Sequence, residues 1–375
     1  MSIAVVGAGP AGSLLAWHLA RAGARVTVFD PSHPREKPCG GGLTGKALAL
    51  LPPAPAEDPL PARVVSECAF EAGAAAAQVD LPAPIAVASR RELDEWLLRQ
   101  AVRAGARHVA ERVVALEKGA LRTAGGRAVP FDLVVGADGA GSIVRRRFLA
   151  PIPTERRMMA AGWFVGGTSP LLVRFAEDIG GYLWLFPRRD HVGVGICAPL
   201  RAVPTRVMLD RLEREVARHF PALAPPDSGR YAHTIPSPSA DARSLLEVAG
   251  EGWALVGDAA ALADPITGEG IYYALRSAAL LAQAVAAGRS PRAYAAELVE
   301  DCGAELLRAA AIRGAFYRPG FAPRMVAFGA RSRAIREVMA ELVLGRQGYR
   351  GLKRRLLRAG PRFVVDLAAS VLRAA

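Results

Sequence analysis

Residues 3–12 read IAVVGAGPAG, an apolar run that passes directly into a glycine-rich turn. Residues 13–22 have the composition of a helix, and residues 25–29 form a second apolar run that ends at Asp30. The order strand, turn, helix, strand predicts a βαβ unit over residues 3–30.

The turn contains the spacing Gly7-x-Gly9-x-x-Gly12, and Asp30 follows Gly12 by eighteen residues. Glycines at these positions permit a tight turn and let the backbone approach a pyrophosphate, which the N–H groups at the start of the helix then bind. An acid at the end of the next strand accepts hydrogen bonds from ribose hydroxyls. The unit therefore predicts a dinucleotide site.

Two later segments indicate which dinucleotide binds. Ala137-Asp138-Gly139 follows an apolar run at residues 131–135, and Gly257-Asp258 follows another at residues 253–256. The sequence PITGEG at residues 265–270 then leads into a helix. A flavin needs a partner for its ribityl chain, and a positive dipole near N1 and O2, where charge collects on reduction. Asp258 can supply the first and the helix N-terminus the second, so we expect FAD.

A period-two pattern marks a different kind of structure. Tyr182, Trp184 and Phe186 alternate with leucines, and residues 192–197 alternate apolar residues with glycine or cysteine. The two runs, joined by residues 187–191, predict an antiparallel hairpin. Spacing alone favours an ordinary core face for the three aromatic side chains.

Composition and charge narrow the class of protein. The 375 residues suggest two domains or one large one, and 51% apolar with 22% charged residues excludes disorder. The net charge of +13 is concentrated in residues 313–375, which carry +11. The first 312 residues therefore carry only +2, which argues against a nucleic-acid-binding protein. The basic tail interleaves cations with Leu352, Leu356, Ala359 and residues 363–365, which predicts an interfacial helix on an anionic membrane. The alternative is a solvated, arginine-rich helical cap.

The four cysteines, at positions 39, 68, 197 and 302, are widely spaced and form neither a zinc pattern nor a redox pair. Residues 1–20 carry no charge, but they lack the basic start of a signal peptide. We therefore expect no metal site, no transmembrane helix and a cytoplasmic protein, peripheral on the inner face of the membrane.

Several of these motifs carry a family resemblance. The A-D-G segment and GDAA…DPITGEGI resemble the FAD motifs of the aromatic-hydroxylase-like flavoproteins. KPCGGGL at residues 37–43 and YLWLFP at residues 182–187 are similar to two motifs of the geranylgeranyl reductase family. Ile179 stands where that family's pattern has proline. The resemblance extends from residue 1 to about residue 300.

The resemblance implies an FAD-dependent reductase of isolated C=C bonds in a polyprenyl lipid, with hydride delivered from N5 of the reduced flavin. Tyr182, Trp184 and Phe186 become substrate contacts, and Cys39 and Tyr182 become candidate proton sources. It places Arg90 near the FAD pyrophosphate, the alternative being a solvated residue at a helix start. The expected FAD contacts are Gly7, Gly9, Gly12, Asp30, Gly41, Gly42, Arg90, Asp138, Gly257, Asp258, Pro265, Gly268, Gly270 and Ile271.

The expected architecture is α/β, with a Rossmann-type FAD-binding domain, an antiparallel β-sheet substrate domain and a helical C-terminal region. Residues 1–60, 86–148 and 243–300 are assigned to the first, 61–85 and 149–242 to the second, and 301–375 to the third. No second G-x-G-x-x-G is present. NAD(P)H or a small redox carrier is therefore expected to deliver electrons transiently.

Two other functions remain open. A monooxygenase or halogenase shares the FAD motifs and would require O2. A non-catalytic prenyl-binding carrier could use the same fold without flavin, but the intact glycine turn and Asp258 argue against it.

Overall fold

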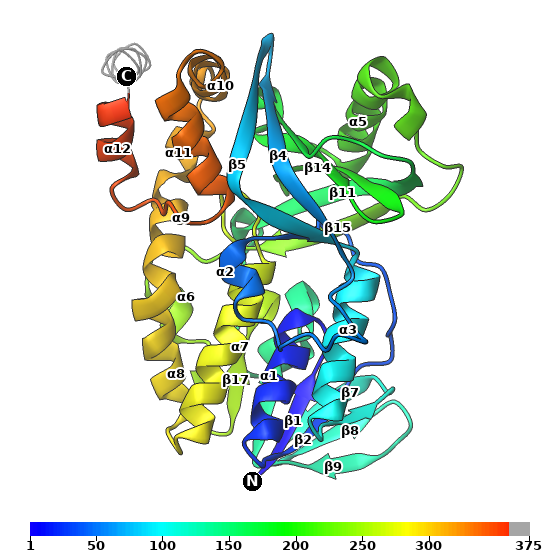
Figure 1. Cartoon of the computed structure of the whole chain (residues 1–375). Coiled ribbons are helices and arrows are strands. Elements are labelled where there is room, and N and C mark those ends of the chain that lie inside the picture. The colour runs from blue at the N-terminus through cyan, green and yellow to red at the C-terminus, as the bar shows by residue number, and fades with distance from the viewer. Residues whose placement is uncertain (360–375) are drawn as a thin grey trace.

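The apolar run at the start of the sequence forms β1 (Ser2–Val6), a nearly fully buried strand at the centre of a six-stranded sheet (Figure 1). The computed structural model describes residues 1–359. The strand order is β16-β17-β10-β1-β2-β6, parallel except for the β16–β17 pair. The other five strands are β2 (Arg25–Phe29), β6 (Arg107–Val109), β10 (Leu133–Gly136), β16 (Ala249–Gly250) and β17 (Trp253–Leu255).

Three helices pack side by side on this sheet. Helix α1 (Pro10–Arg21) lies between α3 (Arg90–Arg103) and α7 (Ile271–Ala286) and contacts both (Figure 1). Their apolar faces join the buried strand residues in one core. Around it lie α2 (Gly45–Leu48), β7 (Val113–Glu117), β8 (Ala120–Thr123), β9 (Ala128–Pro130), α4 (Ile143–Phe148), α6 (Arg243–Leu246) and α8 (Pro291–Leu298).

A second sheet has eight strands in the order β15-β11-β14-β13-β12-β4-β5-β3. All neighbours are antiparallel except β12 and β4. The expected domain limit at residue 85 falls inside β5, which continues to Ala88. The strands are β3 (Gly42–Leu43), β4 (Ala62–Ala72), β5 (Ala75–Ala88), β11 (Arg157–Gly166), β12 (Leu172–Ala176), β13 (Gly181–Pro187), β14 (His191–Pro199) and β15 (Tyr231–Pro236).

The predicted hairpin is confirmed as β13 and β14, and its two faces have different neighbours. Leu183 and Leu185 pack with α5 (Thr205–His219) in a core of their own. The aromatic residues of β13 lie on the opposite face. Opposite Trp184 stands Gly195, where an added Cβ would lie 2.1 Å from the indole ring. The glycine therefore makes room for the aromatic side chain.

The C-terminal helices cover the other half of the second sheet. They are α9 (Ala304–Phe316), α10 (Phe321–Arg331), α11 (Arg333–Val343) and α12 (Leu352–Ala359), and α10 and α11 pack on β5 (Figure 1). Helices α10, α11 and α12 form a third apolar core with β4 and β5, whereas Leu306 of α9 packs in the first core. No helix within residues 1–359 is long and apolar enough to cross a membrane.

The apolar stripe predicted for α12 is only partly open to solvent. Leu356 packs against the third core, and Leu352 lines an internal cavity. The solvent-facing side of the helix carries Lys353, Arg354 and Arg358 together with Leu357, which is 40% exposed. Helical periodicity identified the apolar stripe, but other segments of the same chain cover part of it. The apolar run at residues 363–365 lies outside the described residues.

Candidate functional site

The glycine turn between β1 and α1 combines tight packing with open space. Gly7 has φ +99°, and an added Cβ there would lie 2.4 Å from the carbonyl oxygen of Ala137. A Cβ on Gly12 would lie 1.9 Å from the oxygen of Gly7. At Gly9, by contrast, the nearest atom would be Nη2 of Arg90 at 3.6 Å. Gly7 and Gly12 let the backbone segments touch, whereas Gly9 leaves room for a phosphate at the helix N-terminus.

Asp30 directly follows β2, and its carboxylate is already hydrogen-bonded within the protein. It is 6% exposed and accepts hydrogen bonds from the backbone N–H groups of Ala8 and Ser32, each at 2.9 Å. Burial alone would raise the pKa of Asp30, but the neighbouring His33 ring and these donors outweigh it and lower the pKa. The sequence-predicted ribose acceptor is therefore charged, and it lines the cavity.

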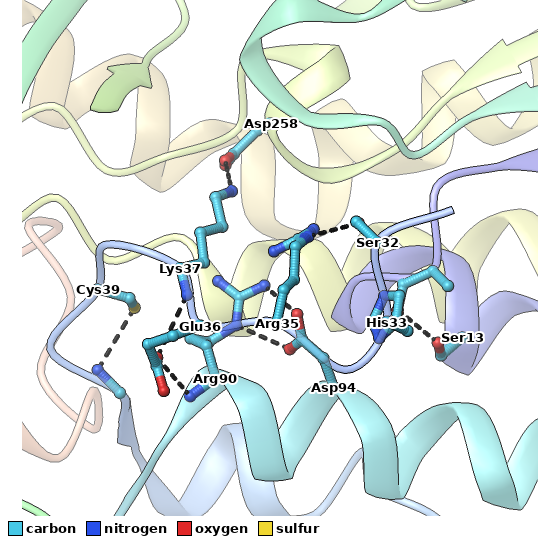
Figure 2. Close-up of polar contacts among 12 residues, drawn as sticks. Ser13, Ser32, His33, Arg35, Glu36, Lys37, Cys39, Arg90, Asp94 and Asp258 are labelled. Atoms are coloured by element: carbon cyan, nitrogen blue, oxygen red, sulfur yellow. Dashed lines mark hydrogen bonds and ion pairs between the residues drawn. The ribbon is translucent and has the colours of Figure 1, made fainter. Parts of the chain in front are cut away.

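Arg90 is buried rather than solvated. Its guanidinium makes two hydrogen bonds of 2.7 Å to Asp94, one turn further along α3 (Figure 2). Ser89 caps the helix by accepting a hydrogen bond from the Glu92 N–H. Burial opposes the charge on Arg90, but the Asp94 carboxylate outweighs it and raises the arginine's pKa. A fixed cation thus stands beside the open space at Gly9.

An ion pair lies on the side of the site opposite Arg90 (Figure 2). Lys37 Nζ lies 3.0 Å from Asp258 Oδ2, on the turn Gly257–Ala260 that follows β17 (Figure 2). Burial would raise the pKa of Asp258, but the Lys37 ammonium outweighs it and lowers the pKa. Lys37 belongs to the KPCGGGL motif but was not among the predicted FAD contacts.

Asp138 lies two residues after the end of β10, and one of its two carboxylate oxygens has no hydrogen-bond partner within the protein described. Oδ2 accepts from the backbone N–H of Ile143 at 2.7 Å, whereas buried Oδ1 has no hydrogen-bond partner among residues 1–359. Burial is the main influence and raises the pKa of Asp138. An orphaned acceptor in a cavity wall needs a polar ligand or water. The open space at Gly9 and this free oxygen fit the phosphates and hydroxyls of FAD.

The loop that leads into β3 is held against the aromatic face of β13. An added Cβ on Gly40 would lie 3.1 Å from the Phe186 ring, and one on Gly41 would lie 2.0 Å from the Ala88 oxygen. Arg188, 1% exposed, donates to the Cys39 carbonyl at 2.7 Å and pairs with Glu36 at 3.0 Å. Sequence analysis missed Arg188; its position directly after the YLWLFP motif was the available signal.

A single cavity of about 1380 Å³ joins these features to the aromatic face of β13. From the glycine turn it passes Cys39, Tyr182, Trp184 and Phe186, and it continues between the second sheet and the C-terminal helices. The distal end is apolar. It is lined by Phe70, Ile85, Leu171, Val173, Phe175, Phe316, Met325, Met339, Leu342 and Val343.

Two expected FAD contacts do not line this cavity. Gly12 packs against Gly7, and Pro265 faces away, with its carbonyl accepting from Arg313 at 2.9 Å. The other twelve expected contacts and the four expected catalytic or substrate residues all line it. Their roles as contacts stay predictions.

Replacing Asp258 by alanine is expected to release FAD. The change removes the charged acceptor beside the flavin end of the cavity and leaves the Lys37 ammonium without its partner. Flavin absorbance per mole of purified protein measures the effect. Asp178→Ala, which breaks an ion pair with Arg211 at the surface, serves as the control. Stoichiometric flavin in the Asp258→Ala protein would show that this carboxylate does not hold the cofactor.

Solved structures share this fold over nearly the whole chain. A geranylgeranyl bacteriochlorophyll reductase-like protein from Thermoplasma acidophilum superposes with a TM-score of 0.71 at 20% identity, covering 98% of both chains. A flavin-dependent brominase gives 0.72 at 19% identity, covering 92% of this chain and 94% of the other. At these identities the likeness establishes the fold alone.

Relatives found by sequence have higher identity to this chain than these two structures do. The chain is 31% identical over 319 residues to menaquinone reductase of Mycobacterium tuberculosis H37Rv, covering 75% of each. It is 31% identical over 312 residues to digeranylgeranylglycerophospholipid reductase of Methanoculleus marisnigri, again covering 75% of each. Geranylgeranyl diphosphate reductase of Rhodobacter capsulatus is 30% identical over 295 residues, covering 72% of this chain and 71% of that protein.

The sequence profile of the FAD binding domain family matches residues 1–299, a span that contains every expected FAD contact. The cofactor is FAD, and the protein is an FAD-dependent oxidoreductase. The chain belongs to the FAD binding domain family and, within it, to the geranylgeranyl reductase group of flavoproteins.

Proposed function

We propose that this protein reduces isolated C=C bonds of a polyprenyl lipid. The observation that carries the proposal is the continuity of the cavity. One end holds the residues that fit FAD, and the other is a long apolar chamber between a sheet and a helical layer. A chain of isoprene units needs such a chamber, because burying its methyl and methylene groups provides its binding free energy.

The aromatic face of β13 lies between the two ends. Tyr182, Trp184 and Phe186 line the cavity beside the loop that carries Cys39. An isolated alkene is unactivated, so protonation at one carbon must accompany hydride delivery to the other. Reduced FAD supplies the hydride. Aromatic rings stabilise the positive charge that develops on the substrate, and the apolar walls exclude water.

The contacts favour Cys39 over Tyr182 as the proton source. The Tyr182 hydroxyl donates to the carbonyl of Thr267, and burial raises the pKa of this phenol well above 10. Its proton is thus both engaged and held tightly. The thiol of Cys39 lies in a partly exposed loop, accepts from the Gly41 N–H at 3.3 Å and donates to no acceptor among residues 1–359.

The relatives at 30–31% identity favour a reductase over a halogenase or monooxygenase. Digeranylgeranylglycerophospholipid reductase and geranylgeranyl diphosphate reductase both name a geranylgeranyl chain. Their head groups differ, so the chain is the shared feature. In our proposal the electrons come from NAD(P)H or a small redox carrier that binds transiently.

Anaerobic turnover tests the function. The holoenzyme is reduced without O2 and incubated with menaquinone, geranylgeranyl diphosphate and a digeranylgeranyl glycerophospholipid, and the lipids are analysed by mass spectrometry. The expected product is at least one lipid heavier by about 2 Da for each bond reduced. If no lipid gains hydrogen, and oxygenated or halogenated products form once O2 and halide are admitted, the alternative function holds.

Trp184→Ala is expected to lower turnover of a long prenyl substrate about a hundredfold or more while leaving flavin content unchanged. The change removes the largest aromatic surface on the substrate side of the cavity. Leu185→Ala is the matched control, because this neighbour faces α5 instead. Turnover and bound flavin are measured together, and parallel loss of both in the Trp184 variant would mark it as core packing.

We also propose that α12 attracts the enzyme to anionic membranes, where a polyprenyl lipid resides. Since its apolar stripe is partly covered, the attraction rests on exposed Lys353, Arg354 and Arg358, each contributing about 1 kcal/mol close to such a surface. Salt should weaken it.

Co-sedimentation with vesicles checks this attraction. Full-length protein should pellet with anionic vesicles at low salt, and less at high salt or with neutral vesicles. Changing the three α12 cations to glutamine should reduce binding, whereas the same change at exposed Arg206, Arg214 and Arg218 of α5 should not. Binding that is indifferent to lipid charge and to both sets of changes would refute the proposal.

A further inference from the structure

The flavin-side loop at residues 264–270 precedes α7 and contributes Thr267, Gly268 and Gly270 to the cavity wall. Hydrogen bonds within the loop hold part of its conformation. Asp264 Oδ1 accepts from the N–H groups of Ile266 and Thr267 at 2.8 and 2.9 Å, and the Gly268 N–H donates to the Asp264 carbonyl. These contacts leave the carbonyls of residues 265–267 and part of the Asp264 carboxylate without partners inside the loop.

Side chains from outside the loop occupy every one of these acceptors. The Tyr182 hydroxyl of β13 donates to the Thr267 carbonyl. Arg313 Nε of α9 donates to Pro265 O at 2.9 Å, and the hydroxyl of Tyr317, which follows α9, donates to Ile266 O at 2.6 Å. The Tyr349 hydroxyl lies 3.0 and 3.1 Å from the two oxygens of Asp264.

The last of these donors is itself anchored. The backbone N–H groups of Tyr349 and Arg350 both donate to Glu305 Oε2, so the segment between α11 and α12 is fixed to α9. An added Cβ on Gly348 would lie 2.5 Å from Glu305, which shows how closely the two segments approach. Tyr349 therefore reaches Asp264 from a fixed position.

We propose that Arg313, Tyr317 and Tyr349 are positioning residues for the flavin. All three come after residue 299, where the match to the FAD binding domain ends, yet they hold the loop that borders the flavin end of the cavity. The C-terminal helices thus set the affinity and the environment of FAD in addition to covering the substrate chamber. The proposal depends on FAD binding and not on the identity of the substrate.

We call Arg313, Tyr317 and Tyr349 the clamp residues, because the chemistry of their side chains suits permanent hydrogen bonds to the loop. Burial raises the pKa of Tyr317 and of Tyr349 well above 10, so both hydroxyls keep their protons in the working pH range. Asp264 is 3% exposed, and its carboxylate is satisfied by two backbone N–H groups and Tyr349. Removing one hydroxyl would leave a buried acceptor unpaired and let the loop shift.

The test compares Tyr317→Phe, Tyr349→Phe and the double variant with Tyr231→Phe. Tyr231 makes the same kind of bond, to Val194 O at 3.0 Å, but contacts neither the loop nor the cavity. Apoprotein is titrated with FAD, and the visible spectrum and midpoint potential of the bound flavin are recorded. We expect about three- to tenfold weaker FAD binding per clamp variant, a larger loss in the double variant and an altered potential.

Thermal unfolding of each apoprotein controls for general destabilisation. Arg313→Gln provides a third, independent clamp variant should a phenylalanine variant not fold. Unchanged FAD affinity and potential in the clamp variants would overturn the proposal. So would equal losses in Tyr231→Phe, which would mark general loosening. No lipid is used, so failure of polyprenyl reduction would leave this result standing.

Discussion

The contact between α1 and the ends of β1 and β10 is the constraint on which the site depends. Gly12 rests on the Gly7 carbonyl and Gly7 on that of Ala137, with no space for a side chain at either position. This approach places the N-terminus of α1 directly above the carboxyl ends of the parallel strands. Asp30 and Asp138 follow the carboxyl ends of β2 and β10, the two strands that flank β1, so both carboxylates reach that edge.

In the second sheet, one face of β13 packs in a core and the other face lines the cavity. The leucines of β13 form a core with α5, which leaves the aromatic side chains on the other face free to line the cavity. Gly195 on β14 gives Trp184 its space, and Arg188 at the end of the hairpin fixes the Cys39 loop against Phe186. The hairpin is therefore both scaffold and cavity wall.

Local features of the site could be predicted from sequence. The glycine turn, the acid at the end of β2 and the N-cap at Ser89 depend on residues within one supersecondary unit. The pairs Lys37–Asp258 and Asp264–Tyr349 could not be predicted, because the partners in each pair are far apart along the chain. Tyr349 meets Asp264 only because the segment between α11 and α12 is fixed to α9.

For α12 and β13, too, the sequence pattern alone could not show which neighbouring elements would pack against each face. Periodicity identified the apolar stripe of α12, but which neighbour covers it is a property of the whole fold. The aromatic residues of β13 could equally have faced a core, and only the position of α5 on the leucine face decides the matter. The family resemblance assigned these aromatic residues to the substrate side, and they line the cavity, while their contact with substrate stays a prediction.

The most direct measurement of the central claim is a single turnover of anaerobically reduced holoenzyme mixed with a polyprenyl lipid. The flavin absorbance and the number of lipid double bonds are followed in the same sample. The account predicts that the oxidised-flavin absorbance returns without oxygen, at a rate that rises with lipid concentration, and that one double bond is lost per flavin oxidised. It would be contradicted if the flavin stayed reduced until oxygen entered, with every double bond intact.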